Sequence, residues 1–317
     1  PIVPLDLGLR PGFEPRVIEE TETYRIHVDG TGVKSMVHTD GTSSIPHYLE
    51  FPLRDRQTWE QDFLPRLDPA TEGRVPDWEP IRRQYAGRDV PLGVSTGSLL
   101  GWLRNWAGFE GISLLVYDDP GLVDEGMEQL CELICTLLEQ VPADLDLDFG
   151  HGWEDICFNH GPMLSPQLAA EWMVPRYARI TDCLRRRHGV DVVVVDCDGN
   201  IDELVPLWLD GGVNCMFPLE VASDTDPYEL RRRHSERVLL KGGVDKRALI
   251  AGPDAIDADI ARLEPLVREG GFVPHVDHRV PPDVSYENYL YYLRRKRDTF
   301  GMPHPEVLTE APDPLVV

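Results

Sequence analysis

Residues 192–195 are four consecutive valines, an apolar run without alternation. Such a run is typical of a strand that helices cover on both faces. Small polar residues follow it, and then an amphipathic segment, residues 201–209, favours a helix. A glycine pair ends that helix, and a second apolar strand over residues 213–217 leads to Glu220. The pattern predicts two βα units of a parallel sheet.

The same alternation of strand and helix continues along the rest of the chain. Strands are predicted over residues 91–95, 143–149, 238–240 and 271–274, and helices over residues 120–141, 166–189, 226–234, 254–268 and 285–297. Pro175 should kink the second of these helices. Polar residues follow nearly every strand, which favours a (β/α)8 TIM barrel over an open doubly wound sheet.

The first 50 residues differ from this pattern. Residues 24–28 and 33–38 alternate about an Asp-Gly-Thr-Gly turn, which predicts a β-hairpin appended to the barrel. We expect one domain over residues 1–317. Because the chain begins at Pro1 without an initiator methionine, we expect its true amino terminus to lie upstream.

Composition narrows the classes of partner. With 42% hydrophobic residues the 317-residue chain can bury one large core, and a formal net charge of -24 argues against nucleic acids and anionic membranes as partners. No run of 18 apolar residues indicates a membrane span. The six cysteines are scattered and suggest no disulfide framework, so we expect a reducing, cytoplasmic compartment.

Carboxylates follow the two central strands. Because the carboxyl ends of parallel strands share one rim, Asp196, Asp198 and Glu220 should converge there. Oxygen ligands from these residues and an imidazole from His278 would suit zinc. The alternative is that Asp198 caps the following helix, Glu220 pairs with an arginine and no metal binds. His275 and His278 would then be structural histidines.

Several longer motifs resemble the uroporphyrinogen decarboxylase superfamily, above all its corrinoid-linked methyltransferase branch. They are GSLLGWLRNWAGFEG near residue 100, WEDICFNHGPMLSP near residue 155, DCDGNIDELVPLWLDGGVN with FPLEV after it, GGVDKRAL, and HRVPPDVSYENYLYY near the end. The resemblance covers roughly residues 90 to 300 and implies a (β/α)8 barrel. Family methyltransferases hold zinc with a His-x-Cys-Gly motif; here Asp196 and Asp198 stand in both ligand places, Glu220 matches the family's glutamate, and His278 takes the last position.

The resemblance and the strand ends together assign roles to the rim residues. Glu154, Asp155, Asn159 and Asp198 are predicted to be catalytic or to orient the substrate. Substrate contacts are predicted for Ser95, Trp102, Arg104, Asn105, Asp245 and His275. The metal ligands are predicted to be Asp196, Asp198, Glu220 and His278.

The resemblance implies an enzyme that moves a methyl group between a small methylated substrate and a corrinoid carried by a separate protein. No Asp-x-His-x-x-Gly motif is present, so we expect no cobalamin site in the chain itself. The second hypothesis is a decarboxylase of a porphyrinogen-like acid, for which Arg104 and Arg279 are the candidate carboxylate-binding residues. The third is a barrel that binds a small ligand without turnover.

Overall fold

The structure, a computed structural model, describes residues 1–41 and 45–304. Contacts between residues divide the chain into two compact units, which we call unit 1, Pro1–Met216, and unit 2, Phe217–Val317. Within the described residues, no helix combines the length and the apolar character that crossing a membrane requires.

The core of unit 1 is a sheet of parallel strands. Its strands, in sheet order, are β1 Ile2–Val3, β6 Gly93–Gly97, β7 Phe149–Trp153, β10 Val192–Asp196 and β11 Cys215–Phe217, whose last residue belongs to unit 2. The pairs β1–β6, β6–β7 and β7–β10 are parallel. The valine run of β10 lies beside the glycines of β7, with Val193 opposite Gly150 and Val195 opposite Gly152.

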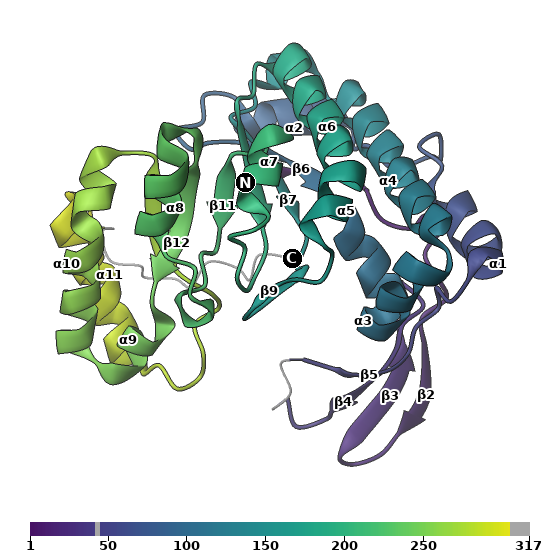
Figure 1. Cartoon of the computed structure of the whole chain (residues 1–317), viewed down its shortest axis with the longest axis horizontal. Coiled ribbons are helices and arrows are strands. Elements are labelled where there is room, and N and C mark those ends of the chain that lie inside the picture. The colour runs from purple at the N-terminus through teal and green to yellow at the C-terminus, as the bar shows by residue number, and fades with distance from the viewer. Residues whose placement is uncertain (42–44, 305–317) are drawn as a thin grey trace. The chain divides into compact units, whose positions relative to one another are not determined.

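Unit 1 also contains helices and shorter helical turns. They are α1 Arg56–Thr58, the π-helix η1 Trp59–Phe63, the 3-10 turns η2 Leu64–Leu67 and η3 Ala143–Leu145, α2 Trp78–Tyr85, α3 Leu100–Asp118, α4 Pro120–Gln140, α5 Pro166–Trp172, α6 Val174–His188 and α7 Val205–Asp210. The central helix α4 packs against both α3 and α6 (Figure 1). Its apolar face is fully buried, including Leu130, Leu133 and Leu137. Burial of that face fixes the helical layer through the hydrophobic effect.

The amino-terminal residues of unit 1 form a separate antiparallel sheet. Its order is β2 Arg16–Glu20, β3 Tyr24–Val28, β4 Lys34–His38 and β5 His47–Glu50, and it stands apart from the helices of unit 1 in Figure 1. The strands β3 and β4 pair as the predicted hairpin. The predicted appendage is therefore confirmed, and it has two more strands than the hairpin alone.

Unit 2 repeats the strand and helix alternation. It contains the 3-10 turns η4 Val221–Ser223 and η5 Ser235–Arg237, the strands β12 Leu239–Val244 and β13 Phe272–Val276, and the helices α8 Pro227–His234, α9 Lys246–Ala251, α10 Pro253–Glu269 and α11 Tyr286–Phe300. The two strands are parallel. Buried Ile260 and Leu263 of α10 belong to the core of this unit, and α10 contacts both strands.

Three element boundaries differ from the prediction. The strand predicted over residues 143–149 is instead β7, Phe149–Trp153. Asp146 is left-handed, with φ 55°, and the Asp148 carboxylate accepts from Leu92 N at 2.7 Å, so this segment is tied to the loop before β6. The helix predicted over residues 201–209 begins only at Val205, after turns in which Asn200 Oδ1 accepts from Asp202 N.

The third difference concerns the strand predicted over residues 238–240, which the structure extends to Val244. Gly242 and Gly243 lie inside β12. A Cβ atom on Gly242 would be 1.7 Å from the Pro218 carbonyl oxygen, and its φ is 119°. Glycine is required there because another backbone passes through the space of a side chain.

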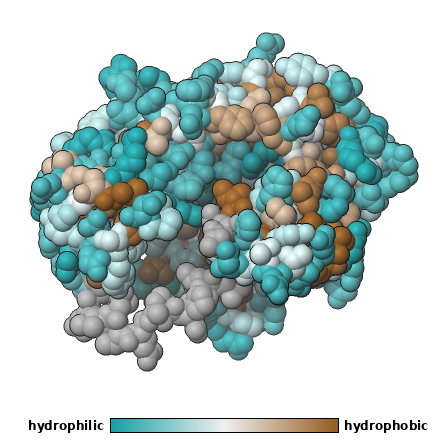
Figure 2. Space-filling model, turned by 90° about the horizontal axis from the view of Figure 1, so that it is seen from below, coloured by the Kyte–Doolittle hydropathy of each residue, from teal (hydrophilic) through white to brown (hydrophobic). Residues whose placement is uncertain are grey.

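The other predicted helices and the strand before α11 agree with the structure to within a few residues, including the interruption at Met173 between α5 and α6. Hydrophilic residues dominate the face seen in Figure 2, with smaller apolar patches among them. This agrees with the large excess of acidic over basic residues in the chain.

Candidate functional site

Two loops at the carboxyl ends of β7 and β10 are bonded to one another in unit 1. Glu154 N donates to Asp196 O at 2.9 Å, and Asn200 N donates to Phe158 O at 2.8 Å. Gly199 lies between these bonds with φ 84°, and a Cβ there would be 2.8 Å from Phe158 O. The two loops, which carry most of the predicted catalytic residues, are therefore held in one register; we call them the unit 1 rim.

Glu154 is the first residue after β7, and it is fully buried. Its carboxylate accepts from Leu99 N and Gly101 N, each at 2.8 Å, from Ser98 Oγ at 3.2 Å and from the Tyr177 hydroxyl. Burial raises the pKa of the Glu154 carboxyl, and these hydrogen bonds oppose that rise. Because the α3 N-cap makes no side-chain bond of its own, Glu154 serves as the cap of α3.

Aromatic rings stand beside this carboxylate. Trp102 stacks on Trp106 with centroids 5.7 Å apart and meets Trp153 edge-on at 5.1 Å. Trp106 is fully buried, whereas Trp102 and Trp153 are half-buried. Arg104, two residues along α3 from Trp102, places Nη2 3.5 Å from Asp155 Oδ2. The start of α3, the end of β7 and the loop after it therefore bring three tryptophans and one ion pair together.

The other unit 1 residues that the sequence predicted for the site are Ser95, Asn105, Asn159, Asp196 and Asp198. Ser95 Oγ accepts from Gly97 N at 3.2 Å and so bonds to its own strand. Asn105 and Asn159 are exposed, and Asp196 and Asp198 are half-buried. Asp198 does not cap α7, which begins seven residues later and has no side-chain cap.

A pair of thiols was missed from the sequence. Cys157 and Cys197, one in each of the two loops, are buried free cysteines. Burial raises the pKa of the Cys197 thiol, and a hydrogen bond with Cys157 adds to the rise. No sequence signal pairs these two residues, because they lie 40 positions apart and only the β7–β10 pairing brings them together.

Unit 2 has its own polar cluster at the ends of its strands. Glu220 Oε1 lies 2.7 Å from Lys246 Nζ, and both side chains are largely buried. Asp277, the first residue after β13, is fully buried and accepts from Val221 N and Lys246 N at 3.0 Å each. Burial raises the pKa of the Asp277 carboxyl, and these two bonds together with the Lys246 charge oppose the rise. The buried carboxylate joins the loops after β11 and β12.

The other unit 2 residues that the sequence predicted for the site are Asp245, His275 and His278. Asp245 is the N-cap of α9, where it accepts from Arg247 N at 2.8 Å and pairs with the Arg247 guanidinium. His275 Nδ1 lies 2.7 Å from Val276 O. His278 is half-buried. The sequence pattern singled out the histidines on either side of Asp277 and missed the carboxylate between them.

The predicted metal ligands belong to different units, Asp196 and Asp198 to unit 1 and Glu220 and His278 to unit 2. In the part of the chain that the structure describes, no group of three or more His, Cys, Asp or Glu side chains is arranged to hold a metal ion. The Glu220 carboxylate is engaged by Lys246. A zinc site therefore stays a prediction from the sequence.

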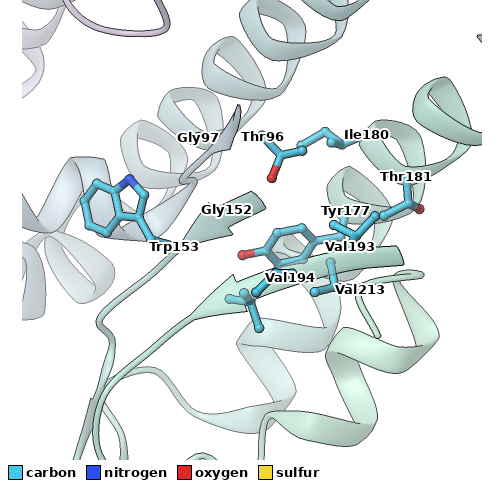
Figure 3. Close-up of a pocket in the computed structure, with 11 residues that line it drawn as sticks. Thr96, Gly97, Gly152, Trp153, Tyr177, Ile180, Thr181, Val193, Val194 and Val213 are labelled. Carbon is cyan, nitrogen blue, oxygen red and sulfur yellow. The ribbon is translucent and has the colours of Figure 1, made fainter. Parts of the chain in front are cut away.

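A small cavity of about 10 Å³ lies in unit 1 behind the candidate site (Figure 3). It is enclosed by β6, β7 and β10 on one side and by Tyr177, Ile180 and Thr181 of α6 on the other. A void of this size holds one water molecule at most. It is a packing defect between sheet and helix, too small to bind a substrate.

Comparison with known proteins gives the class of this chain. Residues 68–297 match the family described as "Uroporphyrinogen decarboxylase (URO-D)". Since the match covers well over half of the 317 residues, the chain belongs to this family. The family resemblance expected from the sequence motifs is confirmed.

Among individual proteins, uroporphyrinogen decarboxylase of Saccharophagus degradans is 26% identical over 222 residues, which are 68% of this chain and 60% of that protein. The uroporphyrinogen decarboxylase of Pseudomonas aeruginosa is 28% identical over 243 residues, 71% of this chain and 63% of that one. The chain thus spans about three fifths of the length of these relatives.

A solved structure is also similar. A methyltransferase from Methanosarcina mazei superimposes with a TM-score of 0.53 over 80% of this chain and 72% of that one, at 13% sequence identity. This likeness concerns the fold alone. Together with the parallel sheet and its covering helices, it confirms the predicted α/β fold of TIM-barrel type.

Proposed function

We propose that the chain is a methyltransferase that moves a methyl group between a small methylated substrate and a corrinoid held by a partner protein. The observation that carries the proposal is the charge of the unit 1 rim. Asp155 and Asp198 come from its two loops and Asp196 ends β10, and the nearby Arg104 is already paired with Asp155. Family membership supports the conclusion that the chain is an enzyme. The charge of the unit 1 rim bears on which reaction that enzyme catalyses.

An acidic rim disfavours a substrate that carries several carboxylates. Like charges in a partly desolvated site repel strongly, and the chain as a whole has a net charge of -24. A neutral or cationic methyl donor meets no such repulsion. The faces of Trp102 and Trp153 would add a favourable interaction with a methylated cation.

The residues of the rim would then have separate tasks. Asp155, oriented by Arg104, would bind the polar end of the donor, with Asn159 and Asp198 as further contacts. Glu154 would act indirectly, because it is buried and holds the start of α3, on which Trp102 and Arg104 stand. The corrinoid, when its carrier protein docks, would accept the methyl group.

Zinc, with Asp196 or Asp198, Glu220 and His278 as ligands, remains part of the hypothesis taken from the family resemblance. No step assigned above depends on it. Elemental analysis of protein purified without chelator tests it, beside Glu220→Gln and His278→Ala. A wild-type protein that is free of zinc, cannot be loaded with it and still transfers methyl groups would end the metal hypothesis.

Methyl transfer is tested by mixing the purified chain with methylated amines, sulfides and ethers and a cob(I)alamin-loaded corrinoid protein, and following the corrinoid spectrum. Formation of methylcobalamin that depends on the chain supports the proposal. Retention of stoichiometric cobalamin by the chain itself would contradict a separate carrier.

Rim variants sharpen this test. Asp155→Asn should lower kcat/KM by about tenfold to a hundredfold, because it removes one charged substrate contact (about 1.5–3 kcal/mol). Asp182→Asn, an exposed carboxylate on α6, is the matched control and should leave the rate unchanged. Equal rates for both variants would remove the rim from the reaction.

Decarboxylation is the second candidate, favoured by the 28% identity to uroporphyrinogen decarboxylase over 243 residues. Incubation of the chain with uroporphyrinogen, with release of carbon dioxide as the readout, distinguishes the two reactions. Turnover abolished by Arg279→Gln, with no methyl transfer, would replace the first proposal by this one.

A further inference from the structure

Two of the four lysines of this acidic chain have no carboxylate partner among the residues that the structure describes. Lys34 and Lys246 each pair with a glutamate, at 2.6 and 2.7 Å. Over residues 1–41 and 45–304, neither Lys241 nor Lys296 forms an ion pair, although acidic residues outnumber basic ones by 55 to 31. Both lysines lie in unit 2 and both are half-buried.

Lys241 stands on β12 beside apolar and aromatic groups. Its Nζ is 4.2 Å from the centroid of the Phe217 ring. The same ring meets the His275 imidazole edge-on at 5.8 Å. On β13, Val273 lies opposite Lys241 in the register, and His275 follows two residues later on the same face. These four side chains therefore form one surface.

Lys296 reaches this neighbourhood from α11. Its Nζ is 3.4 Å from the carbonyl oxygen of Pro274, which lies between Val273 and His275, and 5.3 Å from the centroid of the Tyr292 ring. Burial is the main cause that lowers the pKa of the Lys296 ammonium. Burial thus removes water from the Lys296 ammonium group, which donates a hydrogen bond to the neutral carbonyl of Pro274.

The charges of the two lysines act on the histidine between them. Partial burial lowers the pKa of the His275 imidazole, and the positive charges of Lys241 and Lys296 lower it further. Because the Val276 carbonyl oxygen accepts from Nδ1 of the imidazole, Nε2 of the neutral ring carries a lone pair and can only accept a hydrogen bond. Two ammonium groups therefore lie near one neutral imidazole, and among the described residues of unit 2 neither of them forms an ion pair with a carboxylate.

We propose that Lys241 and Lys296, with Phe217, Val273 and the His275 ring, form a binding site for an organic anion, a carboxylate carried on an apolar or aromatic body. The carboxylate would lie between the two ammonium groups. The apolar body would cover Phe217 and Val273. Val273 is a large hydrophobic residue on a strand and is 61% exposed. An inorganic anion would gain only the charge and not this apolar contact.

The proposed site goes beyond the proposed methyl transfer, since all of its residues belong to unit 2 and binding needs no turnover. Calorimetric titration of the full chain with benzoate tests it directly. Benzamide, a neutral molecule of the same shape, and inorganic phosphate serve as comparison ligands. We expect saturable benzoate binding at millimolar or lower concentration, with benzamide and phosphate each at least about tenfold weaker.

Variants locate the site. Lys241→Met should weaken benzoate binding by about tenfold or more, and Lys296→Gln by about threefold to tenfold, because each removes one positive charge. Lys34→Gln, in the hairpin sheet, is the matched control and should bind as the wild type does. Thermal unfolding of each variant shows whether it is folded, and Lys296→Gln decides the question if Lys241→Met does not fold.

Several outcomes would overturn the proposal. They are the absence of saturable benzoate binding, equal binding of benzamide, equal or tighter binding of phosphate, and unchanged benzoate binding in both folded lysine variants. A chain that binds benzoate but transfers no methyl group would contradict the proposed function and leave this site standing. A chain that transfers methyl groups but does not bind benzoate would contradict this site and leave the proposed function standing.

Discussion

Glu154 in unit 1 and Asp277 in unit 2 occupy equivalent places in the fold. Each is the first residue after a parallel strand, each is fully buried, and each donates its own backbone N–H to a neighbouring strand end, at 2.9 and 2.8 Å. They differ in what their carboxylates bind. Glu154 accepts from two backbone amides and two hydroxyls, whereas Asp277 accepts from two backbone amides.

This comparison shows that a carboxylate is not catalytic merely because it follows a strand. Both side chains join loops that would otherwise bury unsatisfied backbone amides, a cost of about 1–3 kcal/mol each. In unit 1 this anchoring holds the start of α3, and in unit 2 it holds the start of α9. The groups that face solvent stand one or more residues further on, as Asp155 and His278 do.

The largest effect should come from Glu154→Leu. It leaves four donors without their acceptor, and we expect the free energy of unfolding to fall by at least about 3 kcal/mol. Urea unfolding measures the change. Glu171→Gln, at an exposed position on α5, is the control and should be neutral. A loss below about 1 kcal/mol for Glu154→Leu would mean that the carboxylate is not the anchor of α3.

Asp277→Leu should cost less, about 2–3 kcal/mol, because two donors lose their acceptor rather than four. The same unfolding experiment ranks the two variants. If Asp277→Leu costs as much as Glu154→Leu, then the number of bonded donors does not explain the difference between the two anchors.

Lys246→Gln should lower the free energy of unfolding by about 1–2 kcal/mol, since it removes the ammonium group that pairs with the largely buried Glu220 carboxylate. Lys34→Gln breaks a pair whose Glu50 side chain is 68% exposed, and should change stability little. Equal losses for the two variants would show that burial does not strengthen the pair in unit 2.

The smallest effect is a dependence on pH. The pKa of Glu154 is raised in the folded chain, so the folded state holds this proton at pH values where the unfolded state has released it. The stability contributed by that proton falls as pH rises through the folded pKa. The destabilisation caused by Glu154→Gln should therefore be smaller at about pH 8 than at about pH 5.5, measured by urea unfolding. A destabilisation that grows with pH would indicate a lowered pKa instead.

Sequence pattern was sufficient where a local signal has one physical meaning. The valine run of β10 can be buried only as a covered strand, and the Asp-Gly-Thr-Gly turn reverses the chain between β3 and β4. These signals, with the family motifs, determined the α/β class and the hairpin appendage.

Tertiary structure alone decided the start of β7, the place of the glycine pair and the partners of the site residues. Asp148 leaves the strand pattern because it binds Leu92 and Arg88, and Gly242 sits within β12 because Pro218 passes beside it. The sequence singled out Glu154 as a catalytic candidate but not as the buried anchor of α3, and it gave no signal for Lys241, since burial and bonding partners come from residues far along the chain. Local patterns fix elements because their causes lie within a few residues, whereas the environment of a charge depends on contacts that only folding creates.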